Sequence, residues 1–388
     1  MNRTNAETGV GRPGVRGRGA EAGVNLLALR SHNGALVLAL LRTAGPAGIS
    51  RLELAERTGL TPQAVSKITA RLRAEGLAAE AGRRASTGGK PRTVLRLVPE
   101  AGHAVGLHLD RDELTAVLCD LTGTVVARRR VPLGLGAGAE AVFSGAAQEV
   151  ESLLAEVPAA ASVLGVGVAL PGPLDHAHGV LHRVTGFPEW DGFPLRDALT
   201  RRLGVPVVVD KDTNAAALGL ALGLAGGGSV GAGYGSFAYL HLGTGLGAGL
   251  VIGGAVHRGA RTGAGEFGHQ VIQLDGPVCT CGNRGCIEAL CLAAVAAGAV
   301  DEAARVLGTG AANLAGLLDI DLVLLGGRTV AAHPEPFVRG VGAVLDERAR
   351  REGLDAAVPV RIAPGEARGV AEGAAQLLLA PLFGRAEG

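Results

Sequence analysis

Apolar residues in the first part of the chain recur at the spacing of short amphipathic helices, and turn residues separate one apolar stripe from the next. The first stripe begins at Asn33 and ends before Gly45 and Pro46, which predicts a helix between them. A second helix is expected after Ser50, because Ser50 and Glu53 have the spacing of a capping box. Its buried face is predicted to consist of Leu52, Leu54 and Ala55.

A third helix is predicted between Thr61 and Glu75. Thr61 is a favourable N-cap, Pro62 is tolerated at the first helical position, and apolar residues follow at helical spacing. Three short helices with a glycine in the turn before the third are typical of a helix-turn-helix, whose last helix enters the major groove of DNA. From this helix we predict DNA contacts by Thr61, Gln63, Ala64, Ser66, Lys67 and Arg71.

A β-hairpin is predicted between residues 77 and 97, because strand-like positions lie on either side of a glycine-containing turn at 87–89. It would form a basic wing, with DNA contacts by Arg83, Arg84, Lys90 and Arg92. Residues 1–100 hold 16 basic and 7 acidic residues, net +9, whereas the rest of the chain holds 21 and 29, net −8. A basic N-terminal module suits a polyanion. The alternative is a small helical bundle whose charges only face solvent.

After residue 99 the pattern changes to short apolar runs separated by glycine-rich turns and alanine-rich helices, which predicts an α/β domain. Strands are expected at 104–109, 115–121, 125–131, 164–170, 206–210, 236–242, 248–252 and 321–325. Several end in glycine-rich turns, where ligands bind in open α/β sheets. No apolar run reaches the roughly 20 residues of a membrane-spanning helix, and the N-terminus lacks the apolar stretch of a secretory signal. We therefore expect a cytoplasmic protein without a membrane partner.

Three of the five cysteines lie close together with two glycines that allow sharp backbone turns: Cys279, Cys281, Gly282, Gly285 and Cys286. His269 precedes them, which completes the Cys3His composition of a closed structural zinc site. We therefore predict one structural Zn²⁺ held by His269 and the three cysteines. The alternative is a set of cysteines that only pack or form a redox pair. The remaining two, Cys119 and Cys291, are assigned to the core.

After the predicted winged helix, the chain contains, in order, the segments GGKPRTVLRLVPEAGHAVGLHL, VGVALPGPLD, GFPEWDGF, DKDTNAAALGL, LGTGLGAGLVIGG, GEFGH and CTCGNRGCIEAL. In this set the sequence resembles the ROK family of repressors and sugar kinases from about residue 33 to the C-terminus. The resemblance implies a two-lobed actin-like ATPase fold of the ribonuclease H type, assembled as a homodimer or homotetramer. We expect a disordered basic arm over 1–30, a winged helix-turn-helix over 31–99, and a ROK sugar-kinase-like, ligand-sensing domain with the zinc site over 100–388.

The resemblance also implies a ligand site. In ROK sugar kinases, the residues that match Glu266, His269 and Glu288 hold the hexose, and the residue that matches Asp212 is the catalytic base. One imidazole can bind zinc through one nitrogen and face a ligand with the other. Lys211 stands where the kinases have Asn, which places an ammonium beside Asp212 and leaves the identity of the sugar open. Read without the resemblance, the two glutamates would be surface carboxylates.

One departure from the kinase pattern concerns activity. Residues 108–112 read HLDRD where the kinases have Asp-x-Gly-Gly-Thr, the motif that cradles nucleotide phosphates. Carboxylates there would repel a triphosphate, and the glycines are absent. We therefore predict an incomplete ATP site, no enzymatic activity, and Asp212 as a vestigial base. Another departure is that the segment 287–310 is shorter than its usual counterpart, so we expect either a more open ligand pocket or an altered dimer contact.

The function expected from these features is sequence-specific transcriptional regulation. The protein would bind operator DNA, repress carbohydrate-related genes, and respond to a sugar or sugar phosphate as effector. One alternative is an ATP-dependent sugar kinase that carries a DNA-binding domain. A further alternative is a regulator controlled by a protein partner instead of a small ligand.

Overall fold

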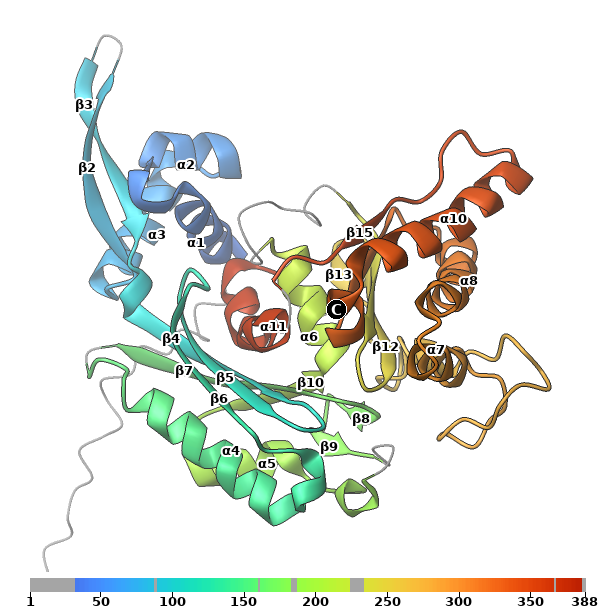
Figure 1. Cartoon of the computed structure of the whole chain (residues 1–388). Coiled ribbons are helices and arrows are strands. Elements are labelled where there is room, and N and C mark those ends of the chain that lie inside the picture. The colour runs from blue at the N-terminus through green and yellow to red at the C-terminus, as the bar shows by residue number, and fades with distance from the viewer. Residues whose placement is uncertain are drawn as a thin grey trace, which may run out of the picture.

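The computed structural model describes residues 32–86, 89–159, 161–182, 187–223, 234–365 and 368–385. The predicted arm over 1–30 lies outside these residues. Figure 1 shows a small N-terminal helical part with a projecting hairpin, placed beside two larger lobes that each contain a sheet. Among the described residues, no helix combines the length and the apolar character needed to cross a membrane.

The N-terminal part has the three helices and the hairpin that the sequence predicts: α1 (His32–Ala44), α2 (Arg51–Thr58), α3 (Pro62–Ala74), β2 (Ala78–Ser86) and β3 (Gly89–Leu97). A short strand, β1 (Ile49–Ser50), pairs with β3 to complete a three-stranded sheet. The predicted capping box is present, because Glu53 N–H donates to Ser50 Oγ at 3.2 Å and Ser50 N–H donates to Glu53 Oε2 at 2.8 Å. The helix-turn-helix prediction is thus confirmed as a fold.

One residue of the predicted buried face of α2 is placed differently. Leu54 and Ala55 are buried, but Leu52 is 41% exposed. Successive residues of an α-helix are rotated by about 100°, so Leu52 lies about 200° from Leu54 and faces away from the core. The prediction for Leu52 was wrong because an apolar residue was assigned by type and not by its angle on the helix.

Each lobe is built on a five-stranded mixed sheet, and the two sheets have the same internal order. The first lobe has the order β10-β7-β4-β5-β6, formed by β4 (Gly102–Leu109), β5 (Leu114–Asp120), β6 (Val125–Val131), β7 (Ser162–Leu170) and β10 (Val207–Lys211). The second lobe has the order β13-β12-β11-β14-β15, formed by β11 (Phe237–Leu242), β12 (Leu246–Ile252), β13 (Ala255–Val256), β14 (Leu322–Gly326) and β15 (Val360–Ile362). In both, an antiparallel meander is followed by two parallel strands. The expected α/β class is confirmed.

Helices cover both faces of each sheet, as Figure 1 shows. The outer face of the first sheet carries α4 (Ala139–Leu154) and α5 (Leu195–Leu203), and a small hairpin, β8 (Leu174–Asp175) and β9 (Val180–Leu181), lies nearby. The outer face of the second sheet carries α7 (Ile287–Ala296), α8 (Val300–Leu318) and α10 (Pro334–Glu352), while the short α9 (Arg328–Ala332) follows β14. Between the two sheets lie α6 (Asp212–Ala221) and α11 (Arg368–Leu379), packed against each other.

Helix α11 packs unusually close to its neighbours because glycines stand at the points of contact. A Cβ atom on Gly106 in β4 would lie 1.9 Å from the carbonyl oxygen of Ala371 in α11. The same distance separates a Cβ on Gly167 in β7 from the carbonyl oxygen of Ala374. Since both obstacles are backbone atoms of α11, a side-chain rotation cannot relieve them. These glycines therefore fix how closely α11 approaches the first sheet.

We expect Gly106→Ala to destabilise the fold by about 3 kcal/mol, because overpacking against backbone forces strands and helix apart. Thermal unfolding of the purified variant would measure the effect. Gly342→Ala on α10 is the matched control, since a Cβ there meets nothing within 4 Å and alanine favours a helix by about 0.5–1 kcal/mol. Equal unfolding midpoints for the Gly106 variant and the unchanged protein would contradict the close contact.

The N-terminal helices share one continuous core with the first lobe. Apolar residues of α1 pack in the same cluster as residues of β5, α11 and the C-terminal turn η7 (Ala380–Phe383). Arg42 in α1 donates through Nε to the carbonyl oxygen of Thr122 at 3.0 Å, and its guanidinium lies 4.7 Å from the ring centre of Phe383. Burial lowers the pKa of Arg42. The winged helix is therefore held against the lobe by a packed interface.

Candidate functional site

The face of α3 that points away from the core is polar and exposed to solvent. Val65, Thr69 and Leu72 are buried, whereas the residues predicted to contact DNA through their side chains are exposed: Gln63, Ser66, Lys67 and Arg71. Ala64 is half-buried, and its N–H donates to Thr61 Oγ1 at 3.2 Å. The hydroxyl of Thr61 therefore caps the helix. The structure brings these residues to one face, and their contact with DNA stays a prediction.

The arginines of the wing differ in whether their side chains form contacts within the domain. Arg83 and Arg92 are exposed on paired strands. Arg84 is engaged within the domain: its Nη1 lies 3.0 Å from Glu53 Oε1, and its Nη2 donates to the carbonyl oxygen of Gly48 at 3.1 Å. This arginine therefore joins the wing to α2, which the charge pattern alone did not predict. The side chain of Lys90 and the turn at 87–88 lie outside the described residues.

Two neighbouring cavities lie in the cleft between the lobes, of about 320 Å³ and about 90 Å³. Both are lined by Asp110, which follows β4, and by His241, which belongs to β11. The smaller cavity is also lined by the glycine-rich turn between β11 and β12 and by the first residues of α6. The cleft is thus formed where strands from both sheets end.

All five residues predicted for the ligand site line the smaller cavity: Lys211, Asp212, Glu266, His269 and Glu288. Lys211 is only 3% exposed, and its Nζ donates to Glu266 Oε1 at 3.1 Å and to the carbonyl oxygen of Ala264. The carboxylate of Glu288 accepts the N–H of Leu246 at 2.8 Å. The ammonium of Lys211 therefore forms its ion pair with Glu266 and not with Asp212, its neighbour in the sequence.

A buried ion pair lies next to Lys211 in the sequence and involves the residue that precedes it. Asp210, the residue before Lys211, accepts from Arg258 Nε at 2.7 Å and from Asn214 Nδ2 at 2.8 Å. Both charged side chains are buried, so their mutual neutralisation and the additional hydrogen bond are needed to offset the loss of hydration. The pair connects the end of β10 to the segment after β13 and thereby sets the position of the predicted ligand residues.

The four predicted zinc ligands form one cluster beside the smaller cavity. The potential ligand atoms of His269, Cys279, Cys281 and Cys286 all lie within 4.8 Å of one another. Cys281 Sγ is 3.7 Å from Cys286 Sγ, and Cys279 Sγ is 3.7 Å from His269 Nδ1. Zn–S bonds of about 2.3 Å in a tetrahedron place sulfur atoms about 3.8 Å apart. The cluster could therefore hold a metal, and the separation of Cys281 Sγ and Cys286 Sγ is close to this value.

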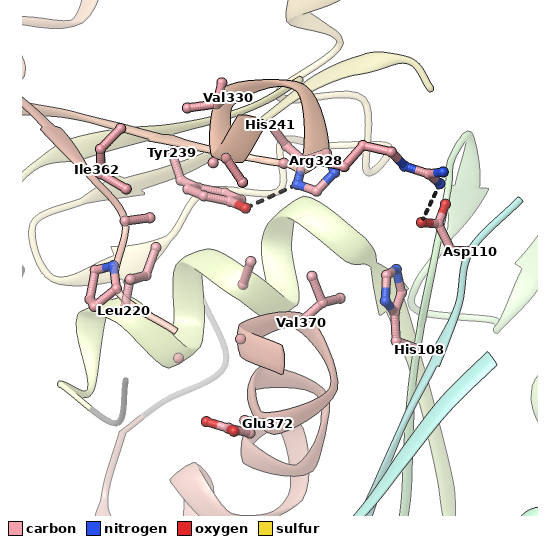
Figure 2. Close-up of a pocket in the computed structure, with 18 of the residues that line it drawn as sticks. His108, Asp110, Leu220, Tyr239, His241, Arg328, Val330, Ile362, Val370 and Glu372 are labelled. Atoms are coloured by element: carbon pink, nitrogen blue, oxygen red, sulfur yellow. Dashed lines mark hydrogen bonds and ion pairs between the residues drawn. The ribbon is translucent and has the colours of Figure 1, made fainter. Parts of the chain in front are cut away.

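The larger cavity has mainly apolar walls with a few polar groups, as Figure 2 shows. Tyr239 Oη and His241 Nδ1 form a hydrogen bond of 2.9 Å on one side. His108, at the end of β4, is 7% exposed, and burial lowers its pKa, so the ring is neutral at pH 7. Leu220, Val330 and Val370 contribute apolar surface from three different helices.

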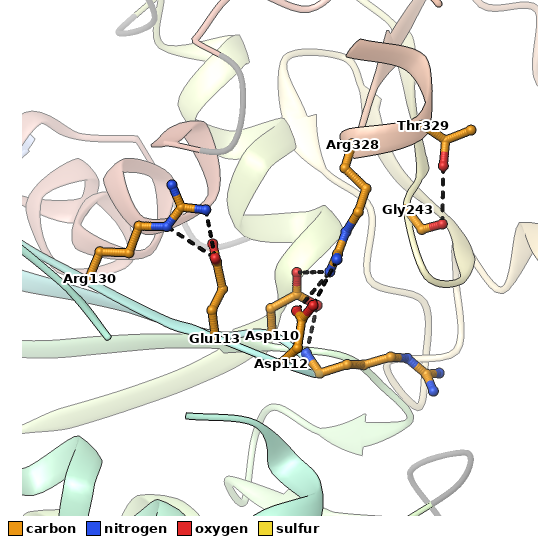
Figure 3. Close-up of polar contacts among 8 residues, drawn as sticks. Asp110, Asp112, Glu113, Arg130, Gly243, Arg328 and Thr329 are labelled. Carbon is orange, nitrogen blue, oxygen red and sulfur yellow. Dashed lines mark hydrogen bonds and ion pairs between the residues drawn. The ribbon is translucent and has the colours of Figure 1, made fainter. Parts of the chain in front are cut away.

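An ion pair joins the two lobes at the edge of this cavity (Figure 3). Arg328 at the start of α9 lies 2.8 Å from both carboxylate oxygens of Asp112 and 3.2 Å from Asp110 Oδ2. We call this group the interlobe ion pair. The hydrogen bond to Asp112 raises the pKa of Arg328, and the guanidinium holds the pKa of Asp112 below its usual value. The carboxylates expected to face a nucleotide are instead engaged by an arginine of the other lobe.

Comparison with known proteins places the chain in a family. Residues 104–294 match the ROK family, and residues 46–78 match a winged helix-turn-helix DNA-binding domain. A ROK hexokinase from Thermus thermophilus is 30% identical, with a TM-score of 0.58, over 72% of this chain and 98% of the hexokinase. The chain belongs to the ROK family.

Other ROK proteins resemble the chain over different lengths. A xylose repressor from Bacillus subtilis is 30% identical over 62% of this chain, and the match spans 61% of the repressor. A ROK family transcriptional regulator described as a homologue of the Escherichia coli MLC protein has a TM-score of 0.72 at 22% identity, over 91% of this chain and 97% of its own. The second likeness confirms the expected architecture of a winged helix-turn-helix joined to a kinase-like ROK domain.

Proposed function

We propose that this protein is a sugar-responsive repressor that binds operator DNA through α3 and the wing. The observation that carries the proposal is the exposed polar face of α3 on a winged helix that shares its core with α11, a helix lining the ligand cleft. A change in lobe position on ligand binding would reach the DNA-binding face through this packing. The names of the related xylose repressors support a sugar as effector.

The proposed DNA contacts are those of the exposed α3 residues together with Arg83 and Arg92, and Lys90 is included on its sequence alone. The proposed effector site consists of Lys211, Asp212, Glu266, His269 and Glu288. One structural Zn²⁺ would hold the segment that carries His269 in place, and its ligands leave no open position for catalysis. We further propose domains over 31–99 and 100–388, a homodimer or homotetramer that binds a palindromic operator, and a cytoplasmic location.

The second candidate is a sugar kinase, favoured by the position of Asp212 in the cleft and by the glycine-rich turn at 243–247. The interlobe ion pair argues against a kinase. By the resemblance, a nucleotide bound between the lobes would bring its phosphates to Asp110 and Asp112. Arg328 is already bound by both carboxylates and is not available to neutralise the phosphates. Phosphates beside carboxylates are repelled unless cations intervene. We therefore favour a regulator without ATP-dependent activity.

The test begins with selection of bound sequences from a random DNA pool by the full chain loaded with zinc. We expect a palindromic site, and we expect at least one of D-xylose, D-glucose or N-acetylglucosamine to change its affinity by about 10-fold, the usual size of allosteric coupling. Fluorescence anisotropy would measure both. Phosphorylation of a sugar by Mg-ATP that disappears in Asp212→Asn would instead establish the kinase.

A further inference from the structure

The turn between β4 and β5 holds four charged residues, and the first three of them face two different places. Asp110 and Asp112 both bind Arg328 of the second lobe. Arg111, between them, lines the smaller cavity together with the predicted effector residues. Its N–H donates to Asp110 Oδ1 at 2.7 Å, which fixes the backbone at this point. The interlobe ion pair therefore determines where Arg111 lies.

The guanidinium of Arg111 reaches the glycine-rich turn of the second lobe. A Cβ atom on Gly245 would lie 3.8 Å from Arg111 Nη2 and 3.1 Å from Glu288 Oε2. The guanidinium and the carboxylate thus flank one position on the turn. On its other side, the guanidinium carbon is 5.6 Å from the ring centre of Phe187. Within the part of the chain that the structure describes, Arg111 forms no ion pair, because both neighbouring carboxylates are bound to Arg328.

We propose that Arg111 is a contact residue of the effector pocket that selects an uncharged monosaccharide, and that Arg328 is the positioning residue that holds it there. The inference rests on the proposed function and names the chemical class of its effector. A sugar hydroxyl between Arg111 and Glu288 can accept a hydrogen bond from the guanidinium and donate one to the carboxylate. Lys211, which also lines the cavity, already donates to Glu266 and Ala264.

The charge of the cavity disfavours a phosphorylated sugar. Glu266 pairs with Lys211 and Asp110 pairs with Arg328. Among the described residues that line the cavity, the carboxylates of Asp212 and Glu288 therefore face one cationic side chain outside these pairs, that of Arg111. A phosphate would add two negative charges to a cleft that is already acidic. A neutral sugar therefore suits the charge of this pocket best.

The first experiment is isothermal titration calorimetry of the full chain with D-xylose, D-glucose and glucose 6-phosphate. We expect the unchanged protein to bind at least one neutral sugar, and glucose 6-phosphate about 10-fold more weakly than glucose or not at all. Arg111→Ala is expected to weaken the neutral sugar by about 10-fold or more, since hydrogen bonds from charged groups are among the stronger ones. Arg129→Ala is the control, because its side chain pairs with Glu156 on the surface.

A second set of variants tests the positioning role. Arg328→Ala is expected to weaken sugar binding several-fold, Arg328→Lys less, and the exchange of charges in Arg328→Asp with Asp112→Arg is expected to restore it in part. A role in stability alone would shift the unfolding midpoint and leave sugar affinity unchanged. Loss of affinity in the single variant without any recovery in the exchanged pair would overturn the assignment of Arg328.

The possible failures can be told apart. Unchanged affinity in Arg111→Ala would overturn this inference alone, because sugar binding and operator binding would both persist. Tighter binding of glucose 6-phosphate than of any neutral sugar would overturn the ligand class. If no sugar binds while operator binding is intact, the inference and the sensing half of the proposed function both fail, and control by a protein partner is favoured.

Discussion

Protein with Cys281→Ser is expected to contain no zinc after purification, whereas the unchanged chain is expected to contain one equivalent. Cys281 supplies one of four potential ligand atoms within 4.8 Å of one another, and a structural zinc site needs all four. Binding of structural zinc contributes about 10–16 kcal/mol in small zinc domains, so its loss should unfold the segment 269–286. Because His269 lines the smaller cavity, sugar binding should be lost as well.

Metal content by mass spectrometry of the purified proteins would decide the zinc prediction. Cys291→Ala is the matched control, since Cys291 is buried in the core of the second lobe and its thiol donates to the carbonyl oxygen of Ala303. Burial raises the pKa of Cys291 to about 12, and Cys291 is not part of the cluster of four potential ligand atoms. Absence of metal from the unchanged protein, prepared with zinc and without chelators, would refute the site.

The second large effect is expected at the DNA-binding face. Lys67→Ala should weaken binding to the selected operator by about 10-fold or more, the range for loss of one base contact. Arg71→Ala should weaken binding to all sequences alike and lower the slope of the salt dependence by about one. Anisotropy titrations at several salt concentrations would separate the two kinds of contact.

Arg305→Ala provides the control for net charge. Arg305 lies on α8 of the second lobe and pairs with Glu302, so its loss should not affect DNA binding. Unchanged operator affinity in both α3 variants would mean that another surface binds DNA. The far-ultraviolet circular dichroism of each variant should match that of the unchanged chain, because both side chains are exposed.

The sequence predicted most elements because their signals are local. Predicted strands at 104–109 and 125–131 correspond to β4 and β6, and the predicted second helix begins after Ser50, as α2 does. Apolar runs bounded by glycine, and a cap three residues from its partner, depend only on neighbouring residues. The structure also brings the proposed ligand residues to one cavity, as the family resemblance implied, and the proposed zinc ligands to one cluster, as the spacing of the cysteines indicated.

Contacts between distant parts of the chain could not be predicted in this way. Arg328 and Asp112 are 216 positions apart, and no periodicity connects them. The sequence shows the carboxylates of the 108–112 segment, but it does not show that an arginine of the other lobe binds them. The role proposed for Arg111 could not be predicted for the same reason. Its guanidinium is available to the effector cavity because the neighbouring carboxylates bind Arg328. Such pairs depend on the three-dimensional arrangement of both lobes.

The shared core at α11 has a consequence for modular engineering. The segment 368–383 lines the cleft at one end and, through Phe383, contacts Arg42 of the DNA-binding part at the other. A chimera that joins residues 32–97 to another kinase-like domain would therefore separate α1 from the C-terminal segment on which it packs. An exchange of sensor domains in this protein must carry the C-terminal segment together with the DNA-binding domain, although residues 97 and 368 are far apart in sequence.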